Sequence, residues 1–209
     1  MKYLFSIVVT GLFFLMQPFV VHAQYSAGDT ITLKGIRYKV TSSNLITNPG
    51  FEDGFTAWTD ASSATTTLST TNFTLVPTGG IDNSQYLVGA KNEGATSAGS
   101  IGTSWKIESG KSYVFTFYVK YLSATTPAAT ELWLKTSLTN SPATSTESRV
   151  LLDGARVETG GVWTLNSIGF TNSSPSYTHL MARFRWLGNR LGFDQFSLYE
   201  AYEIPKTDS

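Results

Sequence analysis

Apolar and polar residues alternate in several stretches of the chain, and this period of two predicts β-strands. The clearest stretch spans residues 112–121. One side of it carries large apolar residues, namely Tyr113, Phe115, Phe117 and Val119. The other side carries mixed residues, namely Val114, Thr116, Tyr118 and Lys120. We expect the first set to lie in a hydrophobic core and the second set to point away from it.

Shorter runs separated by Gly, Pro, Asn and Ser predict further strands. Their expected ranges are 30–34, 36–40, 85–90, 99–107, 131–138, 149–152, 163–170, 179–187 and 191–199. Residues 61–74 are rich in Ser and Thr and fit either a solvated strand or a loop. No amphipathic helix of useful length is present. Many short strands with turn signals between them predict an all-β fold, an antiparallel β-sandwich of the jelly-roll type.

The N-terminus has the pattern of a secretory signal peptide. Lys2 precedes an apolar run over residues 4–14, and small residues lead to a cleavage site after Ala23. Removing these 23 residues from the chain of 209 leaves 186, enough for one domain. We expect three further parts: a leader at 24–41 that is either a hairpin or a spacer, the sandwich at 42–202, and a polar tail at 203–209.

Charge and cysteine content narrow the range of functions. The chain has 15 basic and 15 acidic residues, so it lacks the basic excess that nucleic-acid binding requires. It has no Cys, which excludes disulfides, thiolate metal sites and lipidation at a mature N-terminal Cys. No later segment is apolar enough to span a membrane. We expect a protein that is secreted to the extracellular space or the periplasm and is not a lipoprotein.

The chain contains few of the residues and motifs that usually carry out catalysis. Outside the signal peptide the chain has one histidine, His179, and no Gly-x-Ser-x-Gly motif. A pair of carboxylates would suffice for glycoside cleavage, but the spacing of the acidic residues singles out no pair. We therefore expect a protein that is not an enzyme, with a small glycan-cleaving enzyme as a remote alternative.

The most specific signal lies at residues 44–58, which include Asn-Leu at 44–45, Asn-Pro-Gly-Phe-Glu at 48–52 and Trp58. Four other segments follow: Ser-Gln-Tyr-Leu-Val at 84–88, Gly-Lys-Ser-Tyr at 110–113, Trp163 with Phe170-Thr171, and Phe-Asp-Gln-Phe-Ser-Leu at 193–198. In this order they resemble CenC-type carbohydrate-binding modules of the family four and nine group, which have a galactose-binding-like jelly roll. The resemblance covers about residues 42–200. It implies a polysaccharide-binding sandwich, although the chain has no room for the catalytic domain that such modules usually accompany.

A structural calcium ion is a second implication of the resemblance. Carboxylates and backbone carbonyls are the ligands that Ca²⁺ prefers. The matching positions are the acids Glu52, Asp82 and Asp194 and the carbonyls of Gly50 and Gln85. The alternative is that Glu52 and Asp194 cap turns or accept hydrogen bonds from backbone amides.

The alternation indicates which residues face a glycan. Residues opposite the expected core positions form one platform if the strands at 112–121, 131–138 and 179–187 share a sheet. The platform residues are Trp133, Tyr118, Lys120, Glu131, Lys135, His179, Arg183 and Arg185. An aromatic ring covers the apolar face of a sugar, while charged and polar side chains bind its hydroxyl groups.

Several alternatives stay open for these residues. Trp133 also fits a position packed under a loop at 123–130, and the two arginines fit ion pairs with Glu131 or Glu147. If unpaired, the arginines would suit an acidic glycan. Three other tryptophans are expected in the core or at its rim, namely Trp58, Trp105 and Trp163.

The leading hypothesis is a secreted, noncatalytic protein that binds a polysaccharide or oligosaccharide. The main alternative is an extracellular adhesion or assembly module with a cell-surface protein partner, because one fold serves many functions.

Overall fold

The computed structural model describes residues 25–58, 73–89, 105–122, 131–137, 149–156, 161–185 and 190–206. For residues 131–137, 149–156 and 181–185 this description concerns the backbone. Within these ranges the chain is built from strands, with one 3₁₀ turn at Ile81–Asn83. None of the described segments forms a helix with the length and hydrophobicity that a bilayer crossing requires.

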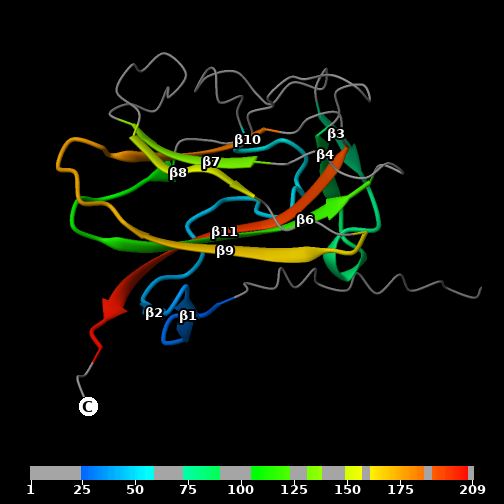
Figure 1. The fold of residues 1–209 in the computed structure, drawn as a ribbon. Coiled ribbons are helices and arrows are strands. Elements are labelled where there is room, and N and C mark those ends of the chain that lie inside the picture. The colour runs from blue at the N-terminus through cyan, green and yellow to red at the C-terminus, as the bar shows by residue number, and fades with distance from the viewer. Residues whose placement is uncertain are drawn as a thin grey trace, which may run out of the picture.

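Two antiparallel sheets form the sandwich, as predicted (Figure 1). The larger has seven strands: β1 (Thr30–Leu33), β2 (Ile36–Val40), β3 (Phe73–Val76), β4 (Tyr86–Gly89), β6 (Ser112–Tyr121), β9 (Thr164–Thr171) and β11 (Leu191–Ile204). The smaller has four, in the order β5 (Trp105–Lys106), β10 (His179–Arg185), β7 (Glu131–Ser137) and β8 (Arg149–Arg156). The predicted all-β jelly-roll class is confirmed.

The core between the sheets is dominated by aromatic residues. Tyr113, Phe115, Phe117 and Val119 of β6 are all buried in it, which confirms the alternation. Trp58 and Trp105 also belong to this cluster, with ring centroids 6.1 Å apart and perpendicular planes. Large aromatic side chains bury much apolar area per residue, so this core provides the main stabilisation in a chain without disulfides.

Strand β11 is the longest described strand and pairs along both of its edges. One edge pairs with β6 from Leu191 to Ala201. The other edge is shared in turn by β4 at residues 191–193, by the irregular segment 41–49, and by β2 at residues 201–204. The chain after β2 thus continues antiparallel to β11, with the Leu45 N–H donating to the Leu198 carbonyl at 2.8 Å.

A β-bulge at Gln195 interrupts the pairing of β11 with β6. The register shifts between Asp194 and Ser197, and Gln195 has a positive φ of 49°. The extra residue reverses the alternation, because Phe193 and Phe196 both reach the core although they are three positions apart. The same bulge leaves Asp194 on the outer side of the sheet, where loops cover it.

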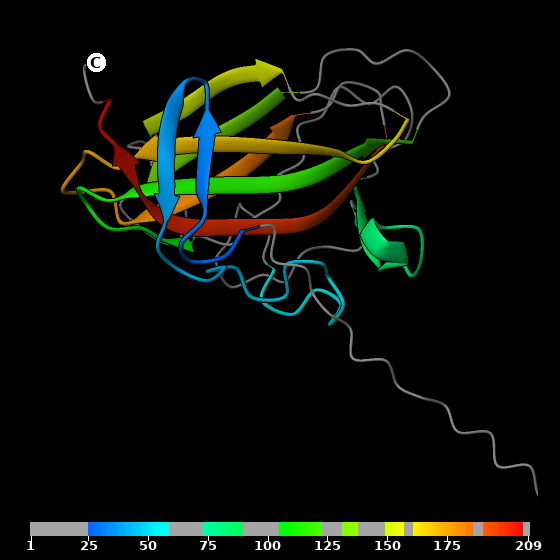
Figure 2. The ribbon, with the colours of Figure 1, turned by 90° about the horizontal axis from the view of Figure 1, so that it is seen from below.

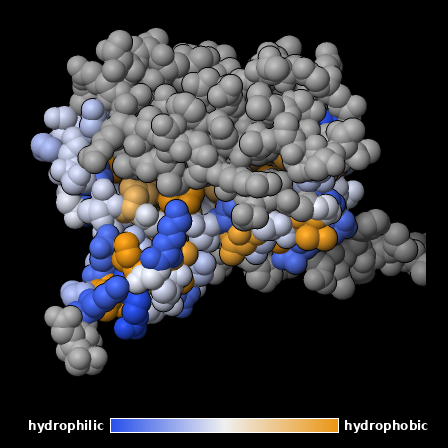
Figure 3. All heavy atoms as spheres, in the orientation of Figure 1, coloured by the Kyte–Doolittle hydropathy of each residue, from blue (hydrophilic) through white to orange (hydrophobic). Residues whose placement is uncertain are grey.

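The hairpin β1–β2, which joins the large sheet through the end of β11, folds over the outer face of β6, β9 and β11 (Figure 2). Tyr38 packs with Val114 and Ala201 in a second apolar cluster, supported by Tyr25, Ile31 and Leu33. Tyr25 is held on Tyr199 by a perpendicular ring contact at 5.8 Å and by a hydrogen bond from its N–H to the Tyr199 hydroxyl. The outer surface of this region is largely hydrophilic, with hydrophobic residues between the polar ones (Figure 3).

The hairpin changes the environment of one predicted surface. Val114 and Thr116 do point away from the main core, yet both are fully buried because the sheet is covered on that side. Strand β11 also runs five residues beyond the predicted end at 199, since its last four residues pair with β2. β3 lies at the end of the Ser/Thr-rich stretch for which the sequence allowed either a strand or a loop.

The contact between Tyr38 and Gly169 provides a test of the hairpin's contribution to stability. A Cβ atom at Gly169 would lie 2.4 Å from two ring carbons of Tyr38, so Gly169→Ala must displace the ring. We expect this substitution to lower the free energy of unfolding by about 1–3 kcal/mol, measured by urea denaturation. The control is Gly161→Ala, where the new Cβ has open space around it. Equal stability of the two variants would contradict the packing described here.

Candidate functional site

The Asn-Pro-Gly-Phe-Glu motif forms a tight loop on the edge of β11. The Asn48 side chain donates to the Gly54 and Thr56 carbonyls and accepts the Asp53 N–H, while its own carbonyl accepts the indole N–H of Trp58. Phe51 and Trp58 pack against each other in the core as a tilted pair, with ring centroids 4.5 Å apart. These residues of the motif therefore have a structural explanation that requires no ligand.

Asp194 is the most deeply buried acidic side chain in the described structure, with no exposed surface. Its Oδ2 accepts the Ile81 N–H at 2.8 Å and the Ser84 hydroxyl at 3.0 Å, and its Oδ1 accepts the N–H of Gln195 at 2.8 Å. The carboxylate thus holds the loop at 79–84 against the bulge of β11. A Cβ at Gly80 would lie 2.5 Å from Oδ2, which explains why a glycine stands there.

The Glu52 carboxylate is close enough for its negative charge to act on Asp194. Its Oε1 accepts the Gln85 N–H at 3.0 Å, and the Gln85 side-chain amide donates to the Phe51 carbonyl. Although the Glu52 side chain is exposed overall, partial desolvation raises its pKa, and the Gln85 N–H opposes this shift. Burial raises the pKa of Asp194 to about 7 despite its three hydrogen bonds, and the negative charge of Glu52 contributes to the shift.

Four of the five predicted calcium ligands gather at this place. Gly50 adjoins Asp194, since a Cβ on Gly50 would lie 3.5 Å from its Oδ1, and Gln85 adjoins Glu52. Asp82 is exposed, and its charge acts on Tyr118. Among the described residues no three acidic or histidine side chains group as metal ligands, so Asp82 does not complete such a set.

The donor chemistry at Asp194 fits a hard cation. Two carboxylates from distant parts of the chain repel each other there, and the surrounding groups include backbone carbonyl oxygens. Ca²⁺ prefers such oxygen ligands, and its charge would offset the repulsion. The backbone hydrogen bonds to both acids also match the alternative that they simply fix loops.

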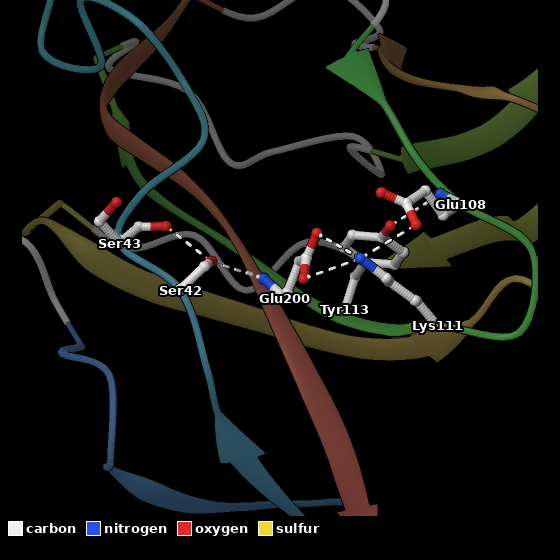
Figure 4. Close-up of polar contacts among 6 residues, drawn as sticks. All are labelled: Ser42, Ser43, Glu108, Lys111, Tyr113 and Glu200. Atoms are coloured by element: carbon white, nitrogen blue, oxygen red, sulfur yellow. Dashed lines mark hydrogen bonds and ion pairs between the residues drawn. The ribbon is translucent and has the colours of Figure 1, made fainter.

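The Gly-Lys-Ser-Tyr motif forms a second polar cluster at the start of β6 (Figure 4). The Lys111 ammonium contacts Glu108 at 3.0 Å and both carboxylate oxygens of Glu200 at 3.1 and 3.2 Å. The Tyr113 hydroxyl accepts the Glu108 N–H, and the Glu200 N–H donates to the Ser42 hydroxyl. The cluster joins three segments of the large sheet, so this motif is structural as well.

The predicted sugar platform is divided between the two sheets. Tyr118 and Lys120 belong to β6, which pairs with β11 and β9, whereas β7 and β10 pair with each other in the smaller sheet. The condition for a single platform, that these three strands share a sheet, is therefore not met. Alternation gives the face on which a residue lies and carries no information on which strands are neighbours.

The register of the smaller sheet groups most of the other predicted residues. Arg183 is opposite Trp133, and Arg185 is opposite Glu131. Leu180 is buried in the core, so odd-numbered positions on β10 and on β7 belong to the outer face. The side chains of Glu131, Trp133, Lys135, Arg183 and Arg185 lie outside the described residues, and their role stays a prediction.

His179 begins β10 opposite Lys106 of β5. Its Nδ1 lies 2.8 Å from the Thr178 hydroxyl, and the ring is half-buried. Burial, followed by the positive charge of Lys106, lowers the pKa of His179. A neutral imidazole at this place is suited to hydrogen bonding with a hydroxyl group.

The outer face of the seven-stranded sheet carries an aromatic pair that the sequence did not single out. Tyr86 and Trp163 lie with ring centroids 5.2 Å apart, and Lys120 lies 5.9 Å from the Trp163 ring. Trp163 had been expected in the core or at its rim and is half-buried. Leu87 is buried in the core, so alternation along β4 could have indicated that Tyr86 points outward.

No protein-family model matches the sequence, and no curated protein sequence matches it. Among solved structures, the chain is similar to the CBM22-1 and GH10 modules of Clostridium thermocellum endo-1,4-β-D-xylanase 10B, complexed with xylohexaose, at 14% identity and a TM-score of 0.55. The match covers 75% of this chain and 28% of that one. The fold is similar to that of carbohydrate-binding modules.

Two further structures have related modules. The CBM22-1–CBM22-2 tandem of Paenibacillus barcinonensis Xyn10C has 14% identity and a TM-score of 0.52, with 90% of this chain and 49% of that chain covered. TmCBM61 in complex with β-1,4-galactotriose has 18% identity and a TM-score of 0.48, with 76% and 99% covered. The chain thus spans about a quarter of the xylanase structure and about half of the tandem. The CenC-type resemblance remains a prediction within this broader class.

The raised pKa of Asp194 predicts how stability depends on pH when chelator removes divalent cations. The folded state holds the Asp194 proton up to about pH 7, while the unfolded chain releases it near pH 4. The free energy of unfolding should therefore fall as pH rises between these values, by up to about 4 kcal/mol. Urea denaturation in EDTA at pH 4 and pH 8 measures this difference. Asp194→Asn should flatten the profile, and an unchanged slope in that variant would assign it to other groups.

Proposed function

We propose that this protein is a secreted, noncatalytic polysaccharide-binding protein. The observation that carries the proposal is the similarity of fold to carbohydrate-binding modules over most of the chain. The compared xylanase modules were complexed with xylohexaose, which makes a β-linked polysaccharide the first class of ligand to test. The signal-peptide pattern at residues 1–23 supports secretion.

The proposed binding surface is the outer face of the four-stranded sheet. The register of β7 and β10 brings a tryptophan, a glutamate and two arginines to neighbouring positions on that face. His179 lies at its end as a half-buried hydrogen-bonding group. Such a combination suits a sugar ring, which offers an apolar face for stacking and a rim of hydroxyl groups.

Binding without cleavage agrees with the role of the acidic residues. The interacting pair of Glu52 and Asp194 accepts hydrogen bonds from three backbone N–H groups and one hydroxyl, which hold loops to β11. Glycoside cleavage instead uses two carboxyl groups that flank a substrate in a cleft. We therefore assign this pair to stability.

Replacement of Trp133 tests the binding proposal. Trp133→Ala should weaken retention in affinity gels that contain xylan or β-1,4-galactan by at least about tenfold, because a central aromatic contact is lost. Trp133→Phe, which keeps an aromatic face, serves as the matched control and should retain most of the affinity. Thermal unfolding checks that both variants are folded. Unchanged retention of Trp133→Ala would remove this residue from the site.

We also propose a structural calcium ion held by Glu52 and Asp194 with the carbonyls of Gly50 and Gln85. Because a ligand that binds the folded state alone stabilises it, calcium at about a hundredfold excess over its Kd adds about 3 kcal/mol. Thermal unfolding at pH 8 should therefore show a higher Tm in calcium than in EDTA. The difference should vanish in Glu52→Gln and persist in Asp82→Asn. An equal Tm in calcium and EDTA for the wild-type protein would contradict the proposal.

A further inference from the structure

The aromatic pair of Trp163 and Tyr86 on the seven-stranded sheet is held in a defined position by the surrounding backbone. Trp163 directly precedes β9, and the pairing of Thr164 with Val119 places it beside Lys120 of β6. Its indole N–H donates to the Gly79 carbonyl at 2.9 Å, in the loop that leads from β3 to β4. The other end of the indole, Cη2, reaches Gly192 of β11, so the ring lies across β6.

Gly192 of β11 forms the floor beneath the rings. A Cβ there would lie 3.0 Å from Cη2 of Trp163 and 3.1 Å from Cε2 of Tyr86. A larger residue would have to push both rings back by a few tenths of an ångström. The two rings therefore rest on bare backbone, and the indole is fixed by the hydrogen bond from its pyrrole N–H to the Gly79 carbonyl. Its orientation is set before any ligand arrives, which lowers the entropic cost of stacking.

The surroundings of the rings supply hydrogen-bonding groups at their rim. The Lys120 ammonium lies over the indole, 5.9 Å from its centroid, and Tyr118, two residues before Lys120, lies on the same face of β6. The Lys120 and Tyr118 side chains are both half-buried, as are Trp163 and Tyr86. A partly exposed aromatic pair with donors beside it matches the two chemical faces of a pyranose ring.

We propose that Trp163 and Tyr86 form a second glycan-binding platform, on the sheet opposite to the one that carries Trp133. A pyranose ring of a neutral polysaccharide packs against the exposed part of these two rings, and Lys120 and Tyr118 bind its hydroxyl groups. This inference rests on the proposed function and extends it. With one contact surface on each side of the sandwich, the protein binds two chains or two segments of one chain at once, which raises retention through multivalency.

Isothermal titration with xylohexaose and affinity electrophoresis in xylan gels test the second platform. The wild-type protein should bind two oligosaccharides, and Trp163→Ala and Trp133→Ala should each bind one. The double variant should bind none. Xylan retention should fall by at least about tenfold in each single variant. The matched control is Val162→Ala, because Val162 is 72% exposed next to Trp163 and lies outside the platform. It should bind as the wild type does.

A second measurement uses the wild-type sequence, so its result does not depend on whether the Trp163→Ala variant folds. With 5-fluorotryptophan incorporated, the ¹⁹F resonance of Trp163, assigned through Trp163→Phe, should shift on addition of xylohexaose. The second platform would be overturned if the wild type had a single binding site per chain that is lost in Trp133→Ala and retained in Trp163→Ala. That result would leave the proposed function intact. Absence of any binding to xylan or β-1,4-galactan by the wild type would overturn both.

Discussion

The hydrogen bonds along the two edges of β11 are the interactions on which the rest of the structure depends. β6 occupies one edge, while β4, the segment 41–49 and β2 share the other. A bulge at Gln195 allows this strand to send both Phe193 and Phe196 into the core. The same bulge sets Asp194 under the loops that it organises. Core packing and loop order are therefore coupled through one residue insertion.

The sequence motifs that resemble carbohydrate-binding modules surround this strand. Asn44 bonds to the backbone of Phe196 and Leu198, Asn48 shapes the loop whose Pro49 carbonyl accepts the Phe196 N–H, and Lys111 contacts Glu200. Each has a structural role. Motifs of this kind can be shared among proteins with different ligands, because they specify how the sandwich closes and leave the outer faces free to vary.

Alternation predicted β6 with its correct bounds and the buried aromatic residues on its inner side. Alternation did not predict the features that depend on contacts between distant parts of the chain. The hairpin packs on Val114 and buries it, and the choice of strand neighbours separates Tyr118 and Lys120 from Trp133. The bulge was also hidden, because Phe193-Asp194-Gln195-Phe196 does not alternate. The gathering of Gly50, Glu52, Gln85 and Asp194 followed from the resemblance, whereas the Trp163–Tyr86 pair depends on the three-dimensional packing of β4 against the start of β9 across β11 and β6.

The position of β11 near the end of the chain affects how the protein can fold. Its partners begin at residue 37, so the large sheet closes through contacts between residues separated by most of the domain. Folds dominated by such distant pairings form slowly, since loop closure precedes the stabilising contacts. A chain emerging from a ribosome cannot complete its core until residues 191–204 are available. Until then its aromatic strands remain exposed, and a chaperone that shields them would limit aggregation.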